Sequence, residues 1–410
     1  MKKLLLAGVA ALSLFAGSAS AQEKTEVIHH FTAATERDSL KILADKFTEM
    51  GGTWVDNAVA GPPNSRRVYT SRMQAGQPPQ AYATVTNRDH LDFIKQGLLV
   101  DIDTVATEGN WREKFPKAII DAISGADGKI YLVPAALYVP NMVFYNKTLF
   151  DKFGIEVPAQ YDETFFAALD KLKENGVVPL AFSSDAFHIR FPFEGMLLAL
   201  GGQDMWNKVW VERDEATLRS DEFRHIVETF GRLRGYVDEG AAGRPWNLSA
   251  NMLASGQAGV QIMGSWANGE YRAAGLSAEK EFGCFIPGQM THVHGDVFVF
   301  PKQPGASEAT AGQKLLAEVV ADPAIQTAYV EPRGAMPVRL DAEFPKNGDA
   351  CLKLGLDTFR TEGAVAANPR SHIDPQVDGE YRDIMNEFFA VPDMPVDEVI
   401  DRLVEALQAS

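Results

Sequence analysis

The sequence predicts a two-lobed α/β protein, and three observations support this prediction. Strand-like and helix-like segments alternate from residue 26 onward, which is typical of an open α/β sheet. Of the 410 residues, 21 form a predicted leader, and the 389 that remain are too many for one ordinary hydrophobic core. No internal repeat or low-complexity linker interrupts the chain, so we expect ordered crossings between the lobes.

The N-terminus predicts export. Lys2 and Lys3 precede an apolar run over residues 4–15, and Ala19-Ser20-Ala21 has the small-residue pattern of a cleavage site. A membrane anchor is the alternative, but the run is shorter than the roughly 20 residues that span a bilayer. No cysteine follows the run, which argues against a lipid anchor. We therefore expect a signal peptide over residues 1–21, cleavage after Ala21 and a periplasmic location.

The mature chain opens with strand, helix and strand. Residues 26–31 (EVIHHF) predict a buried strand, and Thr35 is the expected N-cap of the next helix, with Asp38 three residues on. Apolar side chains then recur at helical spacing until Gly51-Gly52 ends the helix. Residues 53–59 predict the second strand.

The same alternation continues to the end of the chain. An extended stretch over residues 134–146 is the expected first crossing between lobes. We expect helices over 65–75, 89–96, 111–123, 162–174, 191–200, 220–238, 247–255, 312–321, 349–361, 381–389 and 396–409, and strands over 81–86, 129–134, 138–145, 178–182, 258–263 and 295–301.

Net charge indicates which partners are disfavoured, and the cysteine content is interpreted from the expected compartment. The formal net charge is −16, and loss of Lys2 and Lys3 makes it −18, which argues against nucleic acid and anionic membrane surfaces as partners. Cys284 and Cys351 are the two cysteines. In an oxidising compartment such a pair favours a disulfide, with two buried free thiols as the alternative.

Motifs of catalysis and metal binding are absent from the sequence. No nucleophile elbow, zinc-protease motif, C-x-x-C pair or P-loop occurs. His292 and His294 lie on one predicted strand face and could bind a metal, but ordinary hydrogen-bonded histidines are the simpler interpretation. His29 and His30 are expected on opposite faces of their strand. Paired carboxylates leave a secreted glycosidase open as an alternative. We expect no enzyme activity, cofactor or metal.

Four segments resemble the carbohydrate-type extracellular solute-binding proteins of ABC importers. They are residues 138–154 (YVPNMVFYNKTLFDKFG), 157–181, 254–267 (ASGQAGVQIMGSWA) and 334–339 (GAMPVR). Within that family the chain most resembles the glucose- and mannose-binding subgroup, through residues 27–36 and through cysteines that are paired in the subgroup.

The resemblance implies a two-lobed periplasmic binding protein fold with a ligand cleft between lobes joined by several crossings. It implies an N-terminal lobe over residues 22–135 plus 290–335 and a C-terminal lobe over residues 136–289 plus 336–410. It also implies a monomer that binds a glucose-like mono- or small oligosaccharide by hinged closure and delivers it to ABC permease subunits. A binding protein that serves a chemoreceptor is an alternative with the same fold.

A sugar site needs aromatic faces for the ring and polar side chains for its hydroxyl groups. Trp246, Trp266 and Phe31 are the expected stacking residues, although a core position is the alternative for each. Asn87 follows the third predicted strand, where a turn-forming asparagine is equally expected. The resemblance supplies or strengthens the remaining expectations, which are Glu36, Asp296, Arg333 and His372.

Two of these positions depart from the subgroup. Phe31 stands where the subgroup has tryptophan, and Arg333 stands where it has lysine. Arginine is a planar fork, whereas lysine is a flexible point charge, so the two cations recognise different groups. An acidic sugar or a glycoside is therefore an alternative ligand to glucose.

Overall fold

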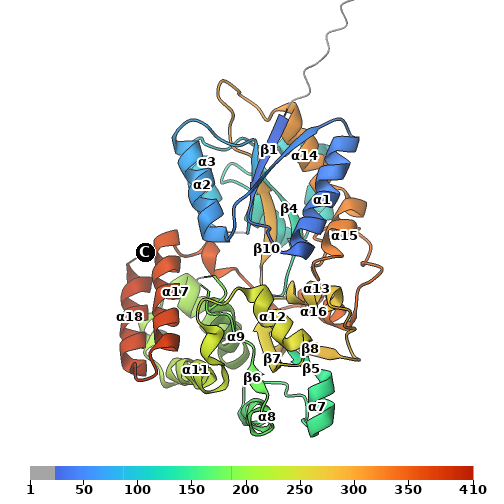
Figure 1. The fold of residues 1–410 in the computed structure, drawn as a ribbon. Coiled ribbons are helices and arrows are strands. Elements are labelled where there is room, and N and C mark those ends of the chain that lie inside the picture. The colour runs from blue at the N-terminus through green and yellow to red at the C-terminus, as the bar shows by residue number, and fades with distance from the viewer. Residues whose placement is uncertain (1–23, 86, 186, 410) are drawn as a thin grey trace, which may run out of the picture.

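The computed structural model describes residues 24–85, 87–185 and 187–409, and two separate sheets organise them (Figure 1). The first sheet has the strand order β2-β1-β3-β10-β4, and the second has the order β6-β7-β5-β8. The predicted signal peptide and its cleavage after Ala21 lie outside the described residues. The strands are β1 (Lys24–His29), β2 (Thr53–Ala58), β3 (Ala81–Val85), β4 (Leu132–Leu137), β5 (Met142–Asn146), β6 (Val178–Leu180), β7 (Ala258–Met263), β8 (Phe282–Phe285), β9 (Thr291–His292), β10 (Gly295–Val299) and β11 (Val365–Ala366).

The first lobe, as we call the part built on the first sheet, is formed by segments far apart in the sequence. Strand β1 is parallel to β2 and β3, whereas β10 is antiparallel to β3 and β4. Helices α1, α14 and α15 cover one face of this sheet, and α2 and α3 cover the other (Figure 1). The helices of this lobe are α1 (Ala34–Glu49), α2 (Pro62–Gln74), α3 (Asp89–Lys95), α4 (Asp103–Glu108), α5 (Trp111–Lys114), α6 (Lys117–Ile123), α14 (Ala311–Ala321) and α15 (Pro323–Val330).

The second lobe, built on the second sheet, is richer in helices. Strand β5 is antiparallel to β7 and β8, and β6 is parallel to β7. Helices α9, α11, α17 and α18 lie together on one side of this lobe (Figure 1). Its helices are α7 (Lys147–Phe153), α8 (Glu163–Glu174), α9 (Arg190–Asn207), α10 (Glu215–Leu218), α11 (Asp221–Arg232), α12 (Trp246–Ala254), α13 (Ala267–Ala273), α16 (Ala350–Arg360), α17 (Pro375–Ala390) and α18 (Val396–Gln408).

Three crossings join the lobes in the described chain, and they are hydrogen-bonded to one another. The first runs from β4 to β5, the second from β9 to β10, and the third follows α15. The backbone amides of Leu137 and Met336 each donate to the carbonyl of the other at 2.9 Å, and the amide of Tyr138 donates to the carbonyl of His294 at 2.9 Å. The lobes are therefore connected by an ordered three-strand junction rather than by a flexible tether.

Helix α11 shows how the sequence pattern produces the core of the second lobe. Ser220 caps the helix by accepting a hydrogen bond from the amide of Phe223. Phe223, Ile226 and Phe230 recur at helical spacing, and each is at most 1 % exposed. Burial of each such side chain contributes about 1.5–3 kcal/mol, so this one helical face supplies several kcal/mol of lobe stability.

The structure corrects several predicted helix limits. Helix α1 has Ala33 as its N-cap, not Thr35, and Glu36 closes the capping box by accepting hydrogen bonds from the helix entry. The helix predicted over 111–123 is split into α5 and α6, because Pro116 lacks the amide that a continuous helix requires. The helix predicted over 220–238 ends at Arg232, and a short 3-10 turn follows it.

Cys284 and Cys351 form a disulfide, with their Cα atoms 5.8 Å apart. The bond joins the edge strand β8 to helix α16 across a sequence separation of 67 residues. It ties the helix that follows the third crossing to the second sheet, and the alternative of two free thiols is excluded.

No helix within the described residues is long and apolar enough to cross a membrane.

Candidate functional site

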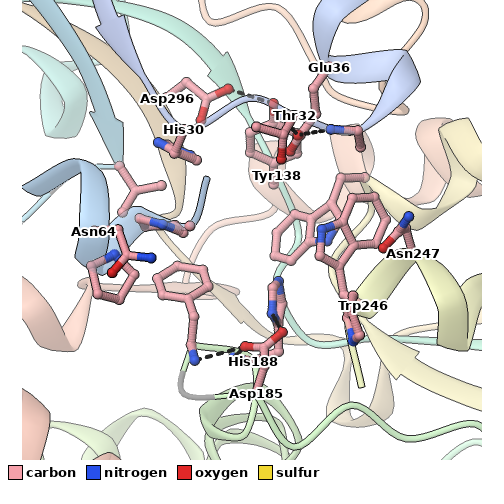
Figure 2. Close-up of a pocket in the computed structure, with 18 of the residues that line it drawn as sticks. His30, Thr32, Glu36, Asn64, Tyr138, Asp185, His188, Trp246, Asn247 and Asp296 are labelled. Atoms are coloured by element: carbon pink, nitrogen blue, oxygen red, sulfur yellow. Dashed lines mark hydrogen bonds and ion pairs between the residues drawn. The ribbon is translucent and has the colours of Figure 1, made fainter. Parts of the chain in front are cut away.

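A cavity of about 500 Å³ lies between the two lobes (Figure 2). Its size falls in the range of roughly 300–1,000 Å³ that is usual for small-molecule sites. Side chains from both lobes line it, with Asp296, His30 and Glu36 on one side and Asp185 and His188 on the other (Figure 2). The full lining comprises His30, Thr32, Ala33, Glu36, Gly61, Pro62, Pro63, Asn64, Val85, Tyr138, Asp185, Phe187, His188, Gly243, Pro245, Trp246, Asn247, Trp266, His294, Asp296 and Arg333.

A buried ion pair forms one wall of the cavity. Arg333 Nη1 lies 2.9 Å from Asp296 Oδ2, and the two side chains are 4 % and 3 % exposed. The hydroxyl group of Tyr138 donates to Asp296 Oδ2 at 2.7 Å, and the hydroxyl group of Tyr329 lies 3.4 Å from the same oxygen. The carboxylate is therefore held in a fixed orientation by three donors.

The charged form of Arg333 is favoured despite its burial. Burial alone would lower the pKa of this guanidinium, but the attraction of Asp296, followed by the nearby Tyr138 and Tyr329, raises the pKa above its ordinary value. Arg333 also lies over the ring of Phe31, 4.4 Å from the ring centroid. A fixed cation beside a fixed carboxylate provides hydrogen-bond donors and acceptors at one wall of the cavity.

Aromatic rings form a second wall. Trp266 packs edge-on against Tyr138 with ring centroids 5.5 Å apart, and the ring of His294 lies 5.6 Å from Trp266. Trp246 begins helix α12 and lies 6.3 Å from the ring of His188. This group of rings offers flat apolar faces inside a cavity that also holds charged groups.

A short turn before helix α9 supplies a second fixed carboxylate. Asp185 Oδ1 accepts hydrogen bonds from the backbone amides of Phe187 and His188 at 2.9 Å each, and Asp185 Oδ2 lies 2.6 Å from His188 Nδ1. Burial alone would raise the pKa of Asp185, but the interaction with His188 and these amides lowers it from its ordinary value. Asp185 is therefore ionised at neutral pH.

His30 and His294 are neutral groups of the cavity. Burial, assisted by the charge of Arg333, lowers the pKa of His30 to about 3. Burial likewise lowers the pKa of His294 well below its ordinary value. A neutral imidazole has one donor and one acceptor nitrogen, so each ring can pair with a hydroxyl group in either role.

Five of the eight predicted ligand residues line this one cavity: Glu36, Trp246, Trp266, Asp296 and Arg333. Glu36 is also part of the capping box, because its Oε2 accepts hydrogen bonds from the amides of Thr32 and Ala33 at 2.8 and 2.9 Å. The carboxylate is consequently fixed at the start of α1.

Three predicted ligand residues lie elsewhere. Phe31 is fully buried beneath Arg333 and does not line the cavity. Asn87 forms a turn, accepting a hydrogen bond from the amide of Asp89 and donating to the carbonyl of Val85. It lines a smaller neighbouring cavity instead. His372 is half-buried in the late loop and lines neither cavity.

Several polar residues of the cavity were not predicted: His30, Asn64, Tyr138, Asp185, His188, Asn247 and His294. Strand alternation carries a partial signal for one of them, since His29 bonds Asp56 at 3.0 Å while the adjacent His30 faces the cavity. The rings of His292 and His294 meet edge-on with centroids 6.1 Å apart, and His292 also lies 3.1 Å from Glu194. The described residues hold no group of three or more His, Cys, Asp or Glu placed to bind a metal ion.

Fold and cavity together define a two-lobed protein with a cavity of small-molecule size between its lobes. The model for the bacterial extracellular solute-binding protein family matches residues 43–349. The chain belongs to this family.

Curated relatives agree with this assignment, and solved structures share the fold. A protein of Rhizobium meliloti named as a probable sugar-binding periplasmic protein is 30 % identical, over 100 % of this chain and 99 % of its own. A bacterial solute receptor described as exclusive for β-D-galactopyranose is similar with a TM-score of 0.79 and 22 % identity, covering 94 % of this chain and 97 % of its own. A chitin oligosaccharide binding protein also gives a TM-score of 0.79, at 20 % identity, covering 94 % of this chain and 98 % of its own.

Proposed function

We propose that this protein is an exported, monomeric sugar receptor that binds a mono- or small oligosaccharide between its lobes and delivers it to an ABC permease. The observation that supports this most directly is the combination of aromatic faces and fixed polar groups in one interlobe cavity. The names of its relatives, which describe periplasmic and sugar-binding proteins, support the compartment and the ligand class.

The cavity matches the chemistry of a pyranose. The C–H faces of the ring would lie against Trp246 and Trp266, because flat aromatic side chains suit apolar ring faces. Hydroxyl groups around the rim would pair with Asp296, Arg333 and Asp185, whose orientations are already fixed by other hydrogen bonds. Preorganised groups lose little conformational freedom on binding, so they favour affinity and specificity.

Closure of the lobes around the sugar is the proposed mechanism. In this proposal the two lobes that close on the sugar are an N-terminal lobe of residues 22–135 plus 290–335 and a C-terminal lobe of residues 136–289 plus 336–410. Thr35 Oγ1 donates to Glu270 Oε1 at 2.7 Å, and Arg88 Nη1 lies 3.0 Å from Asp374 Oδ1, so polar contacts already join the lobes beside the cavity. A sugar that contacts both lobes would favour the closed state by binding it more tightly than the open state.

The resemblance to the glucose- and mannose-binding subgroup favours a glucose-like ligand for this chain. Similar folds bind different carbohydrates, since the solved structures include a receptor for galactopyranose and one bound to tagatose. We propose binding without a chemical step, because both cavity aspartates are already engaged, Asp296 with Arg333 and Asp185 with His188.

The test is a thermal-shift screen of the protein starting at Gln22 against neutral mono- and disaccharides, sugar acids and glycosides. A ligand that binds only the native state stabilises the protein by about 2.7 kcal/mol at 100 times its Kd, and this gain in stability raises the melting temperature. Trp246→Ala is compared with the wild-type protein in the same screen and should show a smaller shift, since this side chain lines the cavity and is only partly buried. No shift with any carbohydrate would overturn the proposal, as would turnover of a glycoside by the purified protein.

A further inference from the structure

A second, smaller cavity of about 200 Å³ adjoins the first, and four of its thirteen lining residues are arginines. Pro62, Pro63 and Phe187 line both cavities, so the two spaces share a wall. The smaller cavity lies between α2 of the first lobe and the start of α17 of the second, which face each other in Figure 1. We call it the side pocket.

The side pocket carries an excess of positive charge. Arg66, Arg67, Arg370 and Arg382 line it against only two carboxylates, Asp89 and Asp378, which gives a formal charge of +2 in a chain whose formal net charge is −16. The excess is therefore local and cannot be attributed to the composition of the protein.

The two carboxylates are already paired with arginines of the pocket, and Asp378 is also paired with Arg190 outside it. Asp89 takes both polar contacts of Arg66, at 2.5 and 3.1 Å. Asp378 is shared by Arg190, by Arg382 at 3.2 Å and by Arg370 at 3.8 Å. One carboxylate thus serves three guanidinium groups, and the longest of the three contacts is to Arg370.

Arg370 is the cation with the weakest compensation. Its side chain is 14 % exposed, and its buried Nη1 atom has no hydrogen-bond partner among the described residues. A buried donor of a charged group without a partner is costly, so the site favours an acceptor that brings negative charge. Burial lowers the pKa of Arg370 from its ordinary value, and the opposing attraction of Asp378 does not compensate.

We propose that the side pocket receives the carboxylate of an acidic sugar whose ring, or whose neighbouring ring, occupies the larger cavity. A guanidinium group matches a planar carboxylate with two parallel hydrogen bonds, which suits Arg370 and the adjacent arginines better than a neutral hydroxyl group does. This inference rests on the proposed sugar-binding function and names its ligand class. The shared wall at Phe187 is where a substituent of the bound sugar would pass from one cavity to the other.

The experiment is calorimetric titration at pH 7 with matched pairs that differ by the acid group: glucuronate against glucose, galacturonate against galactose, and an aldobiouronic acid against its neutral disaccharide. We expect the acidic member of at least one pair to bind about 10- to 100-fold more tightly, as a charge-assisted hydrogen-bonded pair predicts. Arg370→Gln should abolish that preference and leave the affinity for the neutral partner within a few-fold. Arg219→Gln, at an exposed arginine paired with Glu215 and Asp401, is the control for the change in net charge.

The outcomes separate this inference from the function on which it rests. Binding of neutral sugars with no preference for their acids would overturn the carboxylate site in the side pocket but not the proposed sugar-receptor function. No binding of either kind would overturn both proposals. A preference that survives Arg370→Gln, or tighter binding of glucose 6-phosphate than of glucuronate, would also overturn the carboxylate assignment. If Arg370→Gln does not fold, two measurements test the same positive charge. Arg67→Gln, on the exposed face of α2, should reduce the preference for the acidic sugar. High salt should reduce the same preference in the wild-type protein.

Discussion

Asp296→Asn removes the negative charge of the buried cavity pair while keeping the shape of the side chain. In the wild-type protein, Asp296 Oδ2 lies 2.9 Å from Arg333 Nη1, and both side chains are at least 96 % buried. The substitution therefore leaves the buried guanidinium charge of Arg333 without its ion-pair partner, and only the weaker attraction of Glu36 remains. Breaking a buried ion pair in this way costs about 3–5 kcal/mol, because one charge remains desolvated without its partner.

The expected loss lies at the lower end of that range. Asparagine retains one side-chain oxygen that can still accept from the hydroxyl group of Tyr138, so we expect a loss of about 3 kcal/mol in the free energy of unfolding. For a lobe of this size such a loss lowers the melting temperature by about 6–12 °C. Urea unfolding followed by tryptophan fluorescence and by circular dichroism measures the change.

A double-mutant cycle tests the cause. Arg333→Met with Asp296→Asn removes both charges, so the double variant should be more stable than the sum of the two single losses predicts, by about 1–3 kcal/mol. Losses that simply add, or a loss below about 1 kcal/mol for Asp296→Asn, would refute the reasoning that the charge of Arg333 depends on Asp296.

Three further predictions concern stability and binding. The pKa of His30 is about 3 in the folded protein and near 6.5 in the unfolded chain, so only the unfolded chain takes up this proton between those pH values. The free energy of unfolding should therefore fall by about 1.4 kcal/mol for each pH unit between about 6.5 and 3. His30→Gln should remove that part of the fall in urea titrations compared at pH 7 and pH 5. Replacing Cys284 and Cys351 by serine should cost about 4 kcal/mol, since the bond closes a loop of 67 residues, and reduction of the wild-type protein should reproduce the loss. Trp246→Ala should weaken sugar binding at least about tenfold with little change in melting temperature, and an equal loss of both would contradict a binding role.

Local pattern was enough to predict most of the secondary structure. Strand β7 lies over the predicted residues 258–263, and helix α8 begins one residue after its predicted N-terminus at Asp162, which caps it. The misplaced limits have identifiable causes. Pro116 divides one predicted helix, and at α1 the competing cap was Ala33 with Glu36, a pattern without the usual polar N-cap side chain.

The site was harder to predict, because it is assembled from segments that are distant in the sequence. Asp185 and His188 act through a tight turn before α9, and nothing in their local pattern distinguishes them from ordinary loop residues. Phe31 was predicted to end the first strand but lies two residues beyond β1, where Arg333 covers its ring. Which face of this ring is covered depends on a side chain 302 positions later in the chain, which local sequence pattern cannot reveal.

The buried cluster at the cavity wall also lies at the junction of the lobes. Tyr138 lies on the crossing from β4 to β5, Asp296 lies at the start of β10 directly after the second crossing, and Arg333 lies on the third crossing, just after α15. Each crossing thus contributes one member of a single hydrogen-bonded cluster, in addition to the backbone hydrogen bonds that join the crossings. A ligand bound at this wall would contact the same groups that hold the crossings together, so on the proposed function binding would be linked to the relative position of the lobes. A substitution such as Asp296→Asn should therefore change ligand affinity and lobe closure together, while one at Trp246, on α12 and away from the crossings, should change affinity alone.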